Sequence, residues 1–335
     1  MHATRRILFA VKNPDSRRQK GIDKAIAIAK RLRASIELYH AISTPVFLDL
    51  QPLTGTSLAE LKLESLALRQ RRLEAHAARA RASGIDISCN VQWDYPPHEA
   101  IVRRAARIRA DLIIAECHEG SRLKPWLMHL TDWELLRSSR VPVLLLKTTK
   151  LYQRPAILAA VDPAHLHAKP AGLDREILAY GEKLASGLRG SLHAMHANYP
   201  AVFGLTLGDP AIDAMTLAAA YEEQKRKDSA DFKAIATKAG ISRGRQHVVD
   251  GDPVYGIPKV AKAMRAQIVV MGAVSRSGLK RVFIGNTAER VLHYLPCDVL
   301  VVKPPRFHSR VSSKSRGVRV VVPPPLMRGT GLGFS

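Results

Sequence analysis

The sequence repeats itself once, and this repeat limits the folds that the chain can adopt. Residues 109–115, RADLIIA, return 156 positions later as residues 265–271, RAQIVVM. The same offset relates His40 to His196 near the front of each half. It also pairs Asp94 with Asp250, Pro97 with Pro253, Ile101 with Ile257, Leu136 with Leu292 and Lys147 with Lys303. Since 335 residues can hold two domains of about 150 residues each, we interpret the chain as a tandem duplication of one domain.

Each half contains five short apolar runs that are bounded by turn residues and separated by helix-patterned stretches. Because parallel strands require helical crossovers, this order predicts an α/β fold with a five-stranded, parallel, doubly wound sheet in each half. Ligands of such sheets bind beyond the carboxyl ends of the strands. The predicted strands cover residues 7–11, 35–41, 86–92, 112–115 and 141–146 in the first half, and 157–161, 191–197, 245–249, 268–271 and 299–302 in the second.

Changes in composition divide the chain into three parts. We expect a first domain over residues 1–150 and a second over residues 151–305. The polar stretch 147–154 joins them and is short enough for the two domains to pack together, in a pairing that mimics a homodimer. Residues 304–335 contain six Arg or Lys and no acidic residue, so residues 306–335 are predicted to form a disordered basic tail. Within it, the run 318–322 can pair transiently as a strand.

The chain is strongly basic, with 52 Lys and Arg against 29 Asp and Glu and a formal net charge of +23. This charge favours anionic partners, and non-specific association with nucleic acid through the basic surface or the tail is one candidate. The alternative is that basic residues such as Arg17, Arg69 and Arg72 form solvated helix faces. Aromatic residues are sparse and no zinc-finger, RNA-recognition or helix-turn-helix pattern is present, so the sequence indicates no specific recognition of nucleic acid.

The cysteines and the apolar runs bear on the cellular location. Cys89, Cys117 and Cys297 are widely separated, so they predict neither a disulfide framework nor a metal or redox pair, and they suit a reducing cytoplasm. The amino terminus lacks a cleavage-like region, and no apolar stretch approaches the roughly 20 residues that span a bilayer. We therefore expect a cytoplasmic protein without a membrane span.

The segment that follows the fourth strand of the second half carries the features of an anion-binding loop. It reads GAVSRSGLKRVFIGNTAERVL over residues 272–292. Asn286 and Glu289 have the spacing of a capping pair, which would begin a helix and direct free backbone N–H groups at the loop. The alternative is a Gly-rich turn into an ordinary capped helix. Backbone approach, hydroxyl groups and positive charge would come from Gly272, Gly278, Gly285, Ser275, Ser277, Thr287, Arg276, Lys280 and Arg281.

This segment resembles the signature of the universal stress protein family, G-x-x-G-x9-G-[S/T], in which the loop and the helix start bind the phosphates and ribose of ATP. Gly272 and Gly285 match it, while Ser275 stands at the second glycine and Asn286 at the hydroxyl position. The resemblance implies an adenine nucleotide alpha hydrolase-like fold and a site in the second half for ATP, with magnesium, or for another anionic ligand. Its contacts would be Asp162, Pro163, His196, Ala197, Val249, Gly272, Ser275, Gly278, Gly285, Asn286 and Thr287.

The first half keeps the scaffold but not the loop chemistry. Lys12 replaces the aspartate of the first strand, and the four signature positions hold Glu116, Glu119, His129 and Leu130. Because an acidic residue repels phosphate, we expect no ATP binding of this kind in the first half. The strings 130–137 and 285–289, with the paired halves, resemble the tandem type E branch of the family over about residues 4–305. That resemblance implies roles in stress survival, including tolerance of DNA damage.

The sequence predicts a binding protein of the stress response rather than an enzyme. Neither a P-loop lysine nor an evident general base supports more than very slow ATP hydrolysis. The alternative is a ligand-independent adaptor with two degenerate sites, which the departures at Ser275 and Asn286 favour. Oligomerisation beyond the paired halves, to a homodimer, stays open.

Three other groups of residues are given less weight. His165 and His167 lie beside Asp162 but have no evident third metal ligand. Cys117 and His118 lack an oriented third group for nucleophilic catalysis. Core packing is the first interpretation of Trp93, Trp126 and Trp133, and an apolar ligand pocket is the alternative.

Overall fold

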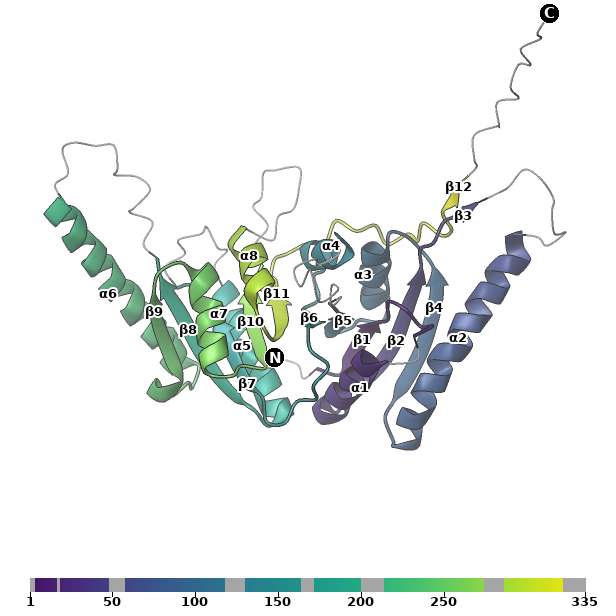
Figure 1. Ribbon diagram of the computed structural model, residues 1–335, viewed down its shortest axis with the longest axis horizontal. Coiled ribbons are helices and arrows are strands. Elements are labelled where there is room, and N and C mark those ends of the chain that lie inside the picture. Colours follow the sequence, from purple (N-terminus) through teal and green to yellow (C-terminus); the bar gives the residue numbers. More distant parts are fainter. Residues whose placement is uncertain are drawn as a thin grey trace, which may run out of the picture.

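The structure is a computed structural model that describes residues 4–16, 19–47, 58–117, 130–163, 172–199, 214–273 and 286–321. Strands and helices alternate along both halves, as the apolar runs predicted (Figure 1). The first half contains β1 (Arg6–Ala10), α1 (Lys20–Leu32), β2 (Ser35–Ile42), β3 (Val46–Phe47), α2 (Leu58–Ala82), β4 (Ile87–Trp93), α3 (Pro97–Arg107), β5 (Leu112–Glu116), α4 (Leu130–Ser138) and β6 (Val143–Leu146). The second contains β7 (Ala156–Ala160), α5 (Leu173–Leu188), β8 (Ser191–Asn198), α6 (Ala214–Lys238), the 3-10 turn η2 (Arg243–Arg245), β9 (Gln246–Asp250), α7 (Pro253–Ala263), β10 (Ile268–Gly272), α8 (Asn286–Tyr294) and β11 (Asp298–Val302), and β12 (Val320–Val321) follows.

The two halves share one ten-stranded sheet in the order β4-β2-β1-β5-β6-β11-β10-β7-β8-β9. All neighbours within each half are parallel, so the predicted doubly wound, parallel α/β fold is confirmed. The halves join where β6 and β11 pair antiparallel. In this junction Leu144 pairs with Leu300, its own duplicate 156 positions later. The halves are therefore related by an approximate two-fold axis, as in an isologous homodimer interface.

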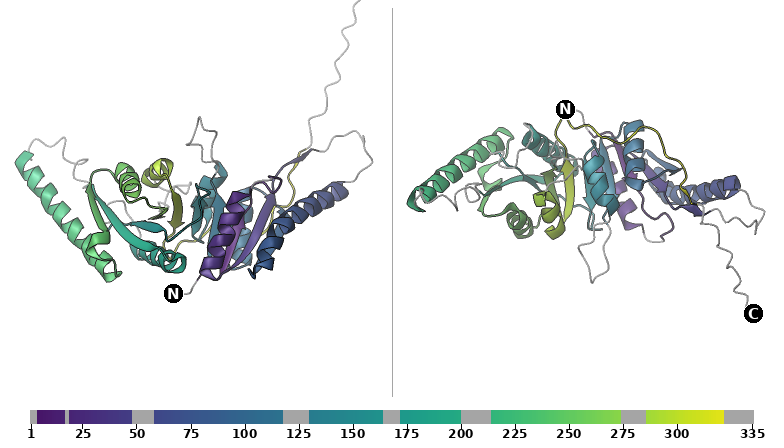
Figure 2. Two further views of the ribbon diagram at one scale, coloured as in Figure 1. Left: turned by 60° about the horizontal axis from the view of Figure 1, so that its bottom comes forward. Right: turned by 90° about the horizontal axis from the view of Figure 1, so that it is seen from above.

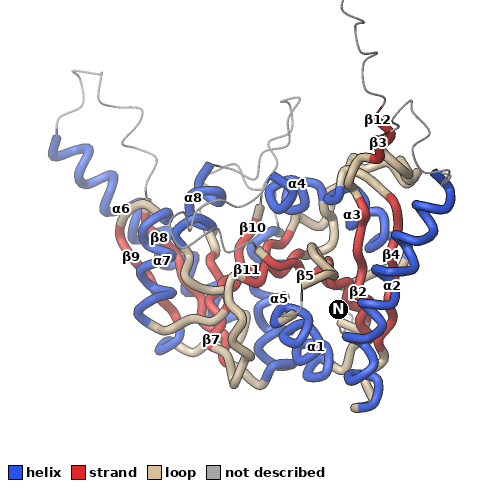
Figure 3. The backbone as a smooth tube through the Cα atoms, turned by 45° about the vertical axis from the view of Figure 1, so that its right-hand side comes forward, coloured by secondary structure: helices blue, strands red, loops and turns tan. Residues whose placement is uncertain are grey.

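The sheet is covered on both faces, which explains why its strands read as continuous apolar runs. Helices α1, α2, α5 and α6 pack on one face, and α3, α4, α7 and α8 pack on the other. Each of the two cores contains residues from both halves. Helices α1 and α5 lie side by side at the centre, while α2 and α6 lie at opposite ends of the molecule (Figures 2 and 3). The two halves therefore form a single packed body.

A buried ion pair ties the connection between the halves to the sheet. Asp298, at the start of β11, is fully buried and pairs with Lys24 of α1. The same carboxylate accepts hydrogen bonds from the backbone N–H groups of Lys147, at 2.8 Å, and Thr148, at 2.9 Å. The hydroxyl of Tyr152 donates to it at 2.5 Å. Residues 147–152 are thus held against both halves.

Four arginines with left-handed backbone conformation mark the duplication at the level of backbone geometry. Arg33 and Arg189, with φ of 54° and 55°, end α1 and α5 and are 156 positions apart. Arg109 and Arg265, with φ of 51° and 53°, lie at the second pair of equivalent positions, just after α3 and α7. Each half therefore uses the same two helix-ending turns.

The first part of the predicted tail, residues 306–321, follows a defined path over the first half. These residues cross from β11 over α4 and α3 of the first half and end in β12, which pairs with β3 (Figure 1). The predicted strand within 318–322 is thus formed at Val320–Val321. Composition alone cannot reveal this path, because Asp94 and Glu99, which bind this basic segment, are more than 200 positions away in the sequence. Residues 322–335 lie outside the described residues.

Among the helices that the structure describes, none combines the length and the apolar character that a bilayer crossing requires.

Candidate functional site

The carboxyl edge of the second half of the sheet is the candidate ligand site. In this half the strands are ordered β9-β8-β7-β10-β11, so the chain reverses its direction of growth between β7 and β10. In open α/β sheets the crevice outside such a switch point is where ligands bind. The residues that follow β7 and end β10 are Asp162 and Gly272, two of the predicted contacts.

Asp162 lies at this edge beside a second carboxylate. Its backbone N–H donates to Oδ1 of Asp174 at 3.1 Å. Asp174 lies in the first turn of α5, where the helix dipole favours a negative charge. Both side chains are half-buried, and both carboxylates can accept hydrogen bonds from the hydroxyls of a sugar. The sequence analysis did not identify Asp174. The two acidic residues Asp174 and Glu176 near the start of a predicted helix could have indicated it.

Gly272 is required by the packing of α5 against the end of β10. A Cβ at this position would lie 2.6 Å from Cδ2 of Leu173, the first residue of α5. The absence of a side chain therefore lets α5 approach the end of β10. The sequence interpretation, that this glycine admits a ligand to the backbone, stays a prediction.

The predicted adenine side is formed by the ends of β8 and β9. Ala197 pairs with Val249 in the sheet, and a Cβ on Gly256 of α7 would lie 3.0 Å from Val249. His196 is buried, and its Nδ1 lies 3.3 Å from the carbonyl oxygen of Val161. Since His40 makes the equivalent contact with Val11 in the first half, at 2.8 Å, this histidine pair fastens the second strand to the first in both halves.

The remaining predicted contacts are placed only in part. Pro163 follows Asp162 and is half-buried. Asn286 and Thr287 begin α8, which starts at the same edge, but their side chains lie outside the described residues. Ser275, Gly278 and Gly285 also lie outside them. Glu289, the expected capping partner of Asn286, pairs with Arg137 of the first half at 2.7 Å.

The same edge of the first half is filled by its own charged side chains. Lys12, at the position of Asp162, pairs with Asp132 of α4 at 2.8 Å. Glu116, at the position of Gly272, occupies the space beside Gly21 in the first turn of α1. Burial raises the pKa of the Glu116 carboxyl, and Lys12 only partly opposes this shift. This edge thus presents an internal ion pair and a carboxyl where the second half presents Asp162 and a glycine.

The structure describes only some of the histidine, cysteine and tryptophan residues that the sequence analysis gave less weight. No group of three or more metal-ligating side chains occurs in the described ranges, and His118, His165 and His167 lie outside them. Burial raises the pKa of the Cys117 thiol, which disfavours a thiolate nucleophile. Trp133 packs against the core below α3 and α4, and Trp93 donates from Nε1 to the carbonyl of Lys62 at 3.3 Å. Trp126 lies outside the described residues.

Comparison with known proteins agrees with the duplicated architecture. The universal stress protein family matches residues 3–147 and 157–303. Universal stress protein E of Escherichia coli strain K12 is 26% identical over 305 residues, which cover 91% of this chain and 96% of that protein. The homolog of that protein in Haemophilus influenzae is 25% identical over 304 residues, covering 89% and 97%.

Solved structures give the same result. A functionally unknown protein of Pseudomonas aeruginosa PAO1 aligns with a TM-score of 0.69 at 26% identity and covers 90% of this chain and 93% of its own. A universal stress protein from Archaeoglobus fulgidus shares the fold, with a TM-score of 0.57 at 17% identity over 88% of this chain and 96% of its own. The resemblance read from the sequence is confirmed.

Proposed function

The chain belongs to the universal stress protein family, and on this premise we propose that its second half binds ATP or another phosphate-bearing ligand at the carboxyl edge between β7 and β10. Asp162 would accept hydrogen bonds from the ribose or base, and the start of α8 would face the phosphates. The first half would pack against the second without binding a nucleotide. The protein would thus act in the stress response as a cytoplasmic binding protein.

The observation that carries this proposal is the contrast between the two duplicated edges. The first-half edge is closed by the Lys12–Asp132 pair and by Glu116, whereas the second-half edge carries Asp162, Asp174 and Gly272. The duplicated edges therefore differ in charge and in free space, although they descend from one domain. Selection for a ligand in one half only is the simplest reason for that difference.

We place the protein among binding proteins rather than enzymes. Burial raises the pKa of the Cys89 and Cys297 thiols to about 12, and that of Cys117 in the same direction, so the thiols stay protonated at neutral pH. A role for magnesium would be to accompany the phosphates of ATP rather than to occupy a protein site of its own.

Thermal unfolding with and without ATP and magnesium tests the proposal. At a ligand concentration of about 100 times Kd the stabilisation is ~2.7 kcal/mol, which corresponds to a midpoint rise of roughly 4 °C in a chain of this size. Asp162→Ala should lose most of this rise. Asp231→Ala, which removes an exposed carboxylate of α6, should keep it. Equal rises in both variants would contradict the assigned edge.

A ligand-independent adaptor is the second candidate, because Ser275 and Asn286 depart from the family signature. No midpoint rise in the unaltered chain with ATP, tripolyphosphate or adenosine would favour the adaptor. A rise with tripolyphosphate but not with adenosine would indicate another phosphate-bearing ligand. Association with nucleic acid rests on the net charge alone, and no arrangement among the described residues adds to it.

A further inference from the structure

Residues 304–321 lie along the first half of the molecule (Figure 1). The path crosses α3 beside the carboxyl end of β4 and ends where β12 pairs in parallel with β3, Val320 with Val46 and Val321 with Phe47. Val311 packs against the core on this face. The segment therefore covers the carboxyl ends of β2 and β4, at the edge where a ligand of the first half would lie.

Asp94, directly after β4, is the centre of the surface on which the segment rests. It is 1% exposed and accepts two hydrogen bonds from Arg103, from Nε and Nη2, each at 2.8 Å. The backbone N–H of Tyr95 donates to the same carboxylate at 2.9 Å. The segment adds the backbone N–H of Arg316, also at 2.9 Å. Because the other donors belong to the first half, the carboxylate is held in place independently of the segment.

Two further groups complete a set that suits an extended basic peptide. Oε1 of Glu99 pairs with Nη2 of Arg316 at 2.9 Å, while its Oε2 pairs with Arg103 at 2.9 Å. Nη1 of Arg103 donates to the carbonyl of Ser312 at 3.4 Å. The surface thus offers one carboxylate to a backbone N–H, a second to a guanidinium, and a guanidinium to a backbone carbonyl. These are the groups that an arginine-bearing strand requires.

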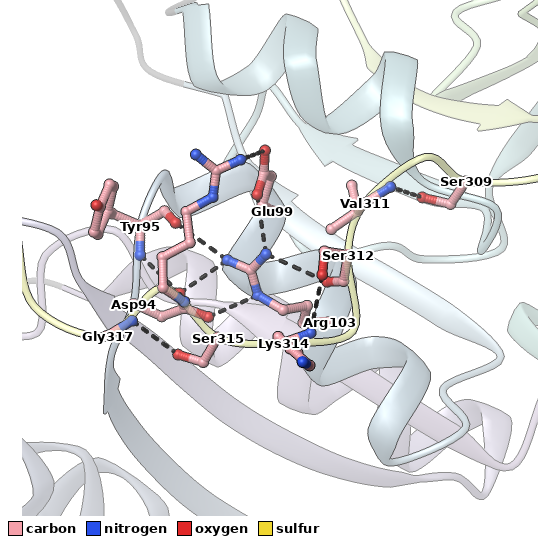
Figure 4. Close-up of polar contacts among 11 residues, drawn as sticks. Asp94, Tyr95, Glu99, Arg103, Ser309, Val311, Ser312, Lys314, Ser315 and Gly317 are labelled. Carbon is pink, nitrogen blue, oxygen red and sulfur yellow. Dashed lines mark hydrogen bonds and ion pairs between the residues drawn. The ribbon is translucent and has the colours of Figure 1, made fainter.

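The segment is shaped for this surface by its own serines. The hydroxyls of Ser309, Ser312 and Ser315 accept hydrogen bonds from the backbone N–H groups two residues on, at 3.3, 3.2 and 3.1 Å (Figure 4). Such local turns reduce the conformational entropy that is lost on docking. The segment also carries basic residues and no acidic residue, opposite in sign to Asp94 and Glu99.

The second half lacks this surface. Tyr255 stands at the position of Glu99, and Lys259 at the position of Arg103. Asp250, the duplicate of Asp94, pairs with Lys225 of α6 at 2.9 Å and has a side chain that is 57% exposed. The duplicated scaffold alone therefore does not create the surface.

The segment is held by few contacts. Most of its residues are exposed, including the side chain of Arg316, which is 52% exposed. Exposed ion pairs and single hydrogen bonds contribute little each, so the segment can leave the surface while the rest of the chain stays folded.

We propose that the first half carries a docking site for an extended basic peptide, read by Asp94, Glu99 and Arg103, and that residues 304–321 are its resident occupant. A peptide of the same chemistry binds there when the resident segment leaves. The proposal does not depend on a ligand in the second half.

The test compares the unaltered full chain with Arg316→Glu and, as the matched control, Lys314→Glu. The two variants make the same charge change two residues apart, but only Arg316 contacts Glu99. Hydrogen exchange of residues 312–321 should accelerate at least about tenfold in R316E and stay unchanged in K314E. A fluorescent peptide with the sequence of residues 304–321 should bind R316E at least about tenfold more tightly than it binds the unaltered chain or K314E, since a tethered occupant competes at an effective concentration near millimolar.

Two controls separate docking from general charge attraction. The same peptide carrying Arg316→Glu should bind the R316E chain at least tenfold more weakly. Adding Glu99→Gln to the R316E chain should also weaken binding of the unaltered peptide. Equal peptide affinity for all three chains, no binding to R316E, unchanged exchange in R316E, or equal affinity for both peptides would each overturn the proposal.

Discussion

Replacing Lys24 with methionine is expected to lower the free energy of unfolding by about 3 kcal/mol. The side chains of Lys24 and Asp298 are 1% and 0% exposed, so the lost cation is not replaced by bulk water. Leaving one charge of a buried pair unpaired costs about 3–5 kcal/mol. We expect the lower end of that range because Tyr152 and the backbone N–H groups of Lys147 and Thr148 continue to donate to the carboxylate.

Urea unfolding followed by circular dichroism measures this change. Lys30→Met is the matched control, because Lys30 lies exposed on the same helix and its loss should change stability by less than about 0.5 kcal/mol. Burial lowers the pKa of Lys24 although Asp298 opposes the shift, so desolvation outweighs the attraction within the pair. The double variant Lys24→Met, Asp298→Asn should therefore lose less stability than the sum of the two single variants.

A difference of less than 1 kcal/mol between K24M and K30M would refute this reasoning, because it would mean that the Asp298 site tolerates an unpaired charge. If the double variant lost as much stability as the sum of the two single variants, the coupling of the two groups would be refuted.

The halves share both cores, so the unaltered chain should unfold in one transition, and two separate transitions would contradict that packing.

Two other expectations concern single residues. Burial lowers the pKa of Lys303 to about 7, while the unfolded chain keeps this lysine protonated up to about pH 10.5, so stability should rise with pH between these values. Lys303→Met should remove about 2 kcal/mol of the rise between pH 7.5 and 9.0 in urea titrations, and equal pH profiles in both chains would contradict this. Arg33→Gly and Arg189→Gly should each stabilise the chain by about 0.5–1 kcal/mol, because glycine adopts their left-handed conformation without steric cost. A lower unfolding midpoint in both would show that their side chains matter more than their backbone.

The strands and their order of appearance could be read from the sequence because they depend on local pattern. The run 35–41 became Ser35–Ile42, and the run 268–271 became Ile268–Gly272. The merging of two sheets into one could not be read, since any apolar edge strand of the correct length can pair with its duplicate. The direct pairing of Leu144 with Leu300 depends on how two finished halves meet.

The places of Asp162 and Gly272 could be predicted from the sequence, because each lies at the end of one predicted strand. Contacts between residues that are far apart in the sequence could not be predicted. Asp174 joins the edge because α5 begins beside β7. The ion pair between Glu289 and Arg137 joins α8 to α4, a helix of the other half. The ordered segment 304–321 likewise required knowledge of Asp94 and Glu99, which no local pattern of basic residues contains.

The antiparallel pairing of β6 and β11 relates the two halves by an approximate two-fold axis, but the side chains at their two carboxyl edges differ. In a true homodimer with this architecture, both edges would be equivalent, and a ligand could bind twice, with the first binding event influencing the second. Here Lys12, Glu116 and the docked segment belong to one edge, whereas Asp162, Asp174 and Gly272 belong to the other. We therefore expect a ligand of either edge to find one site per chain, so that binding saturates at one ligand per chain rather than two.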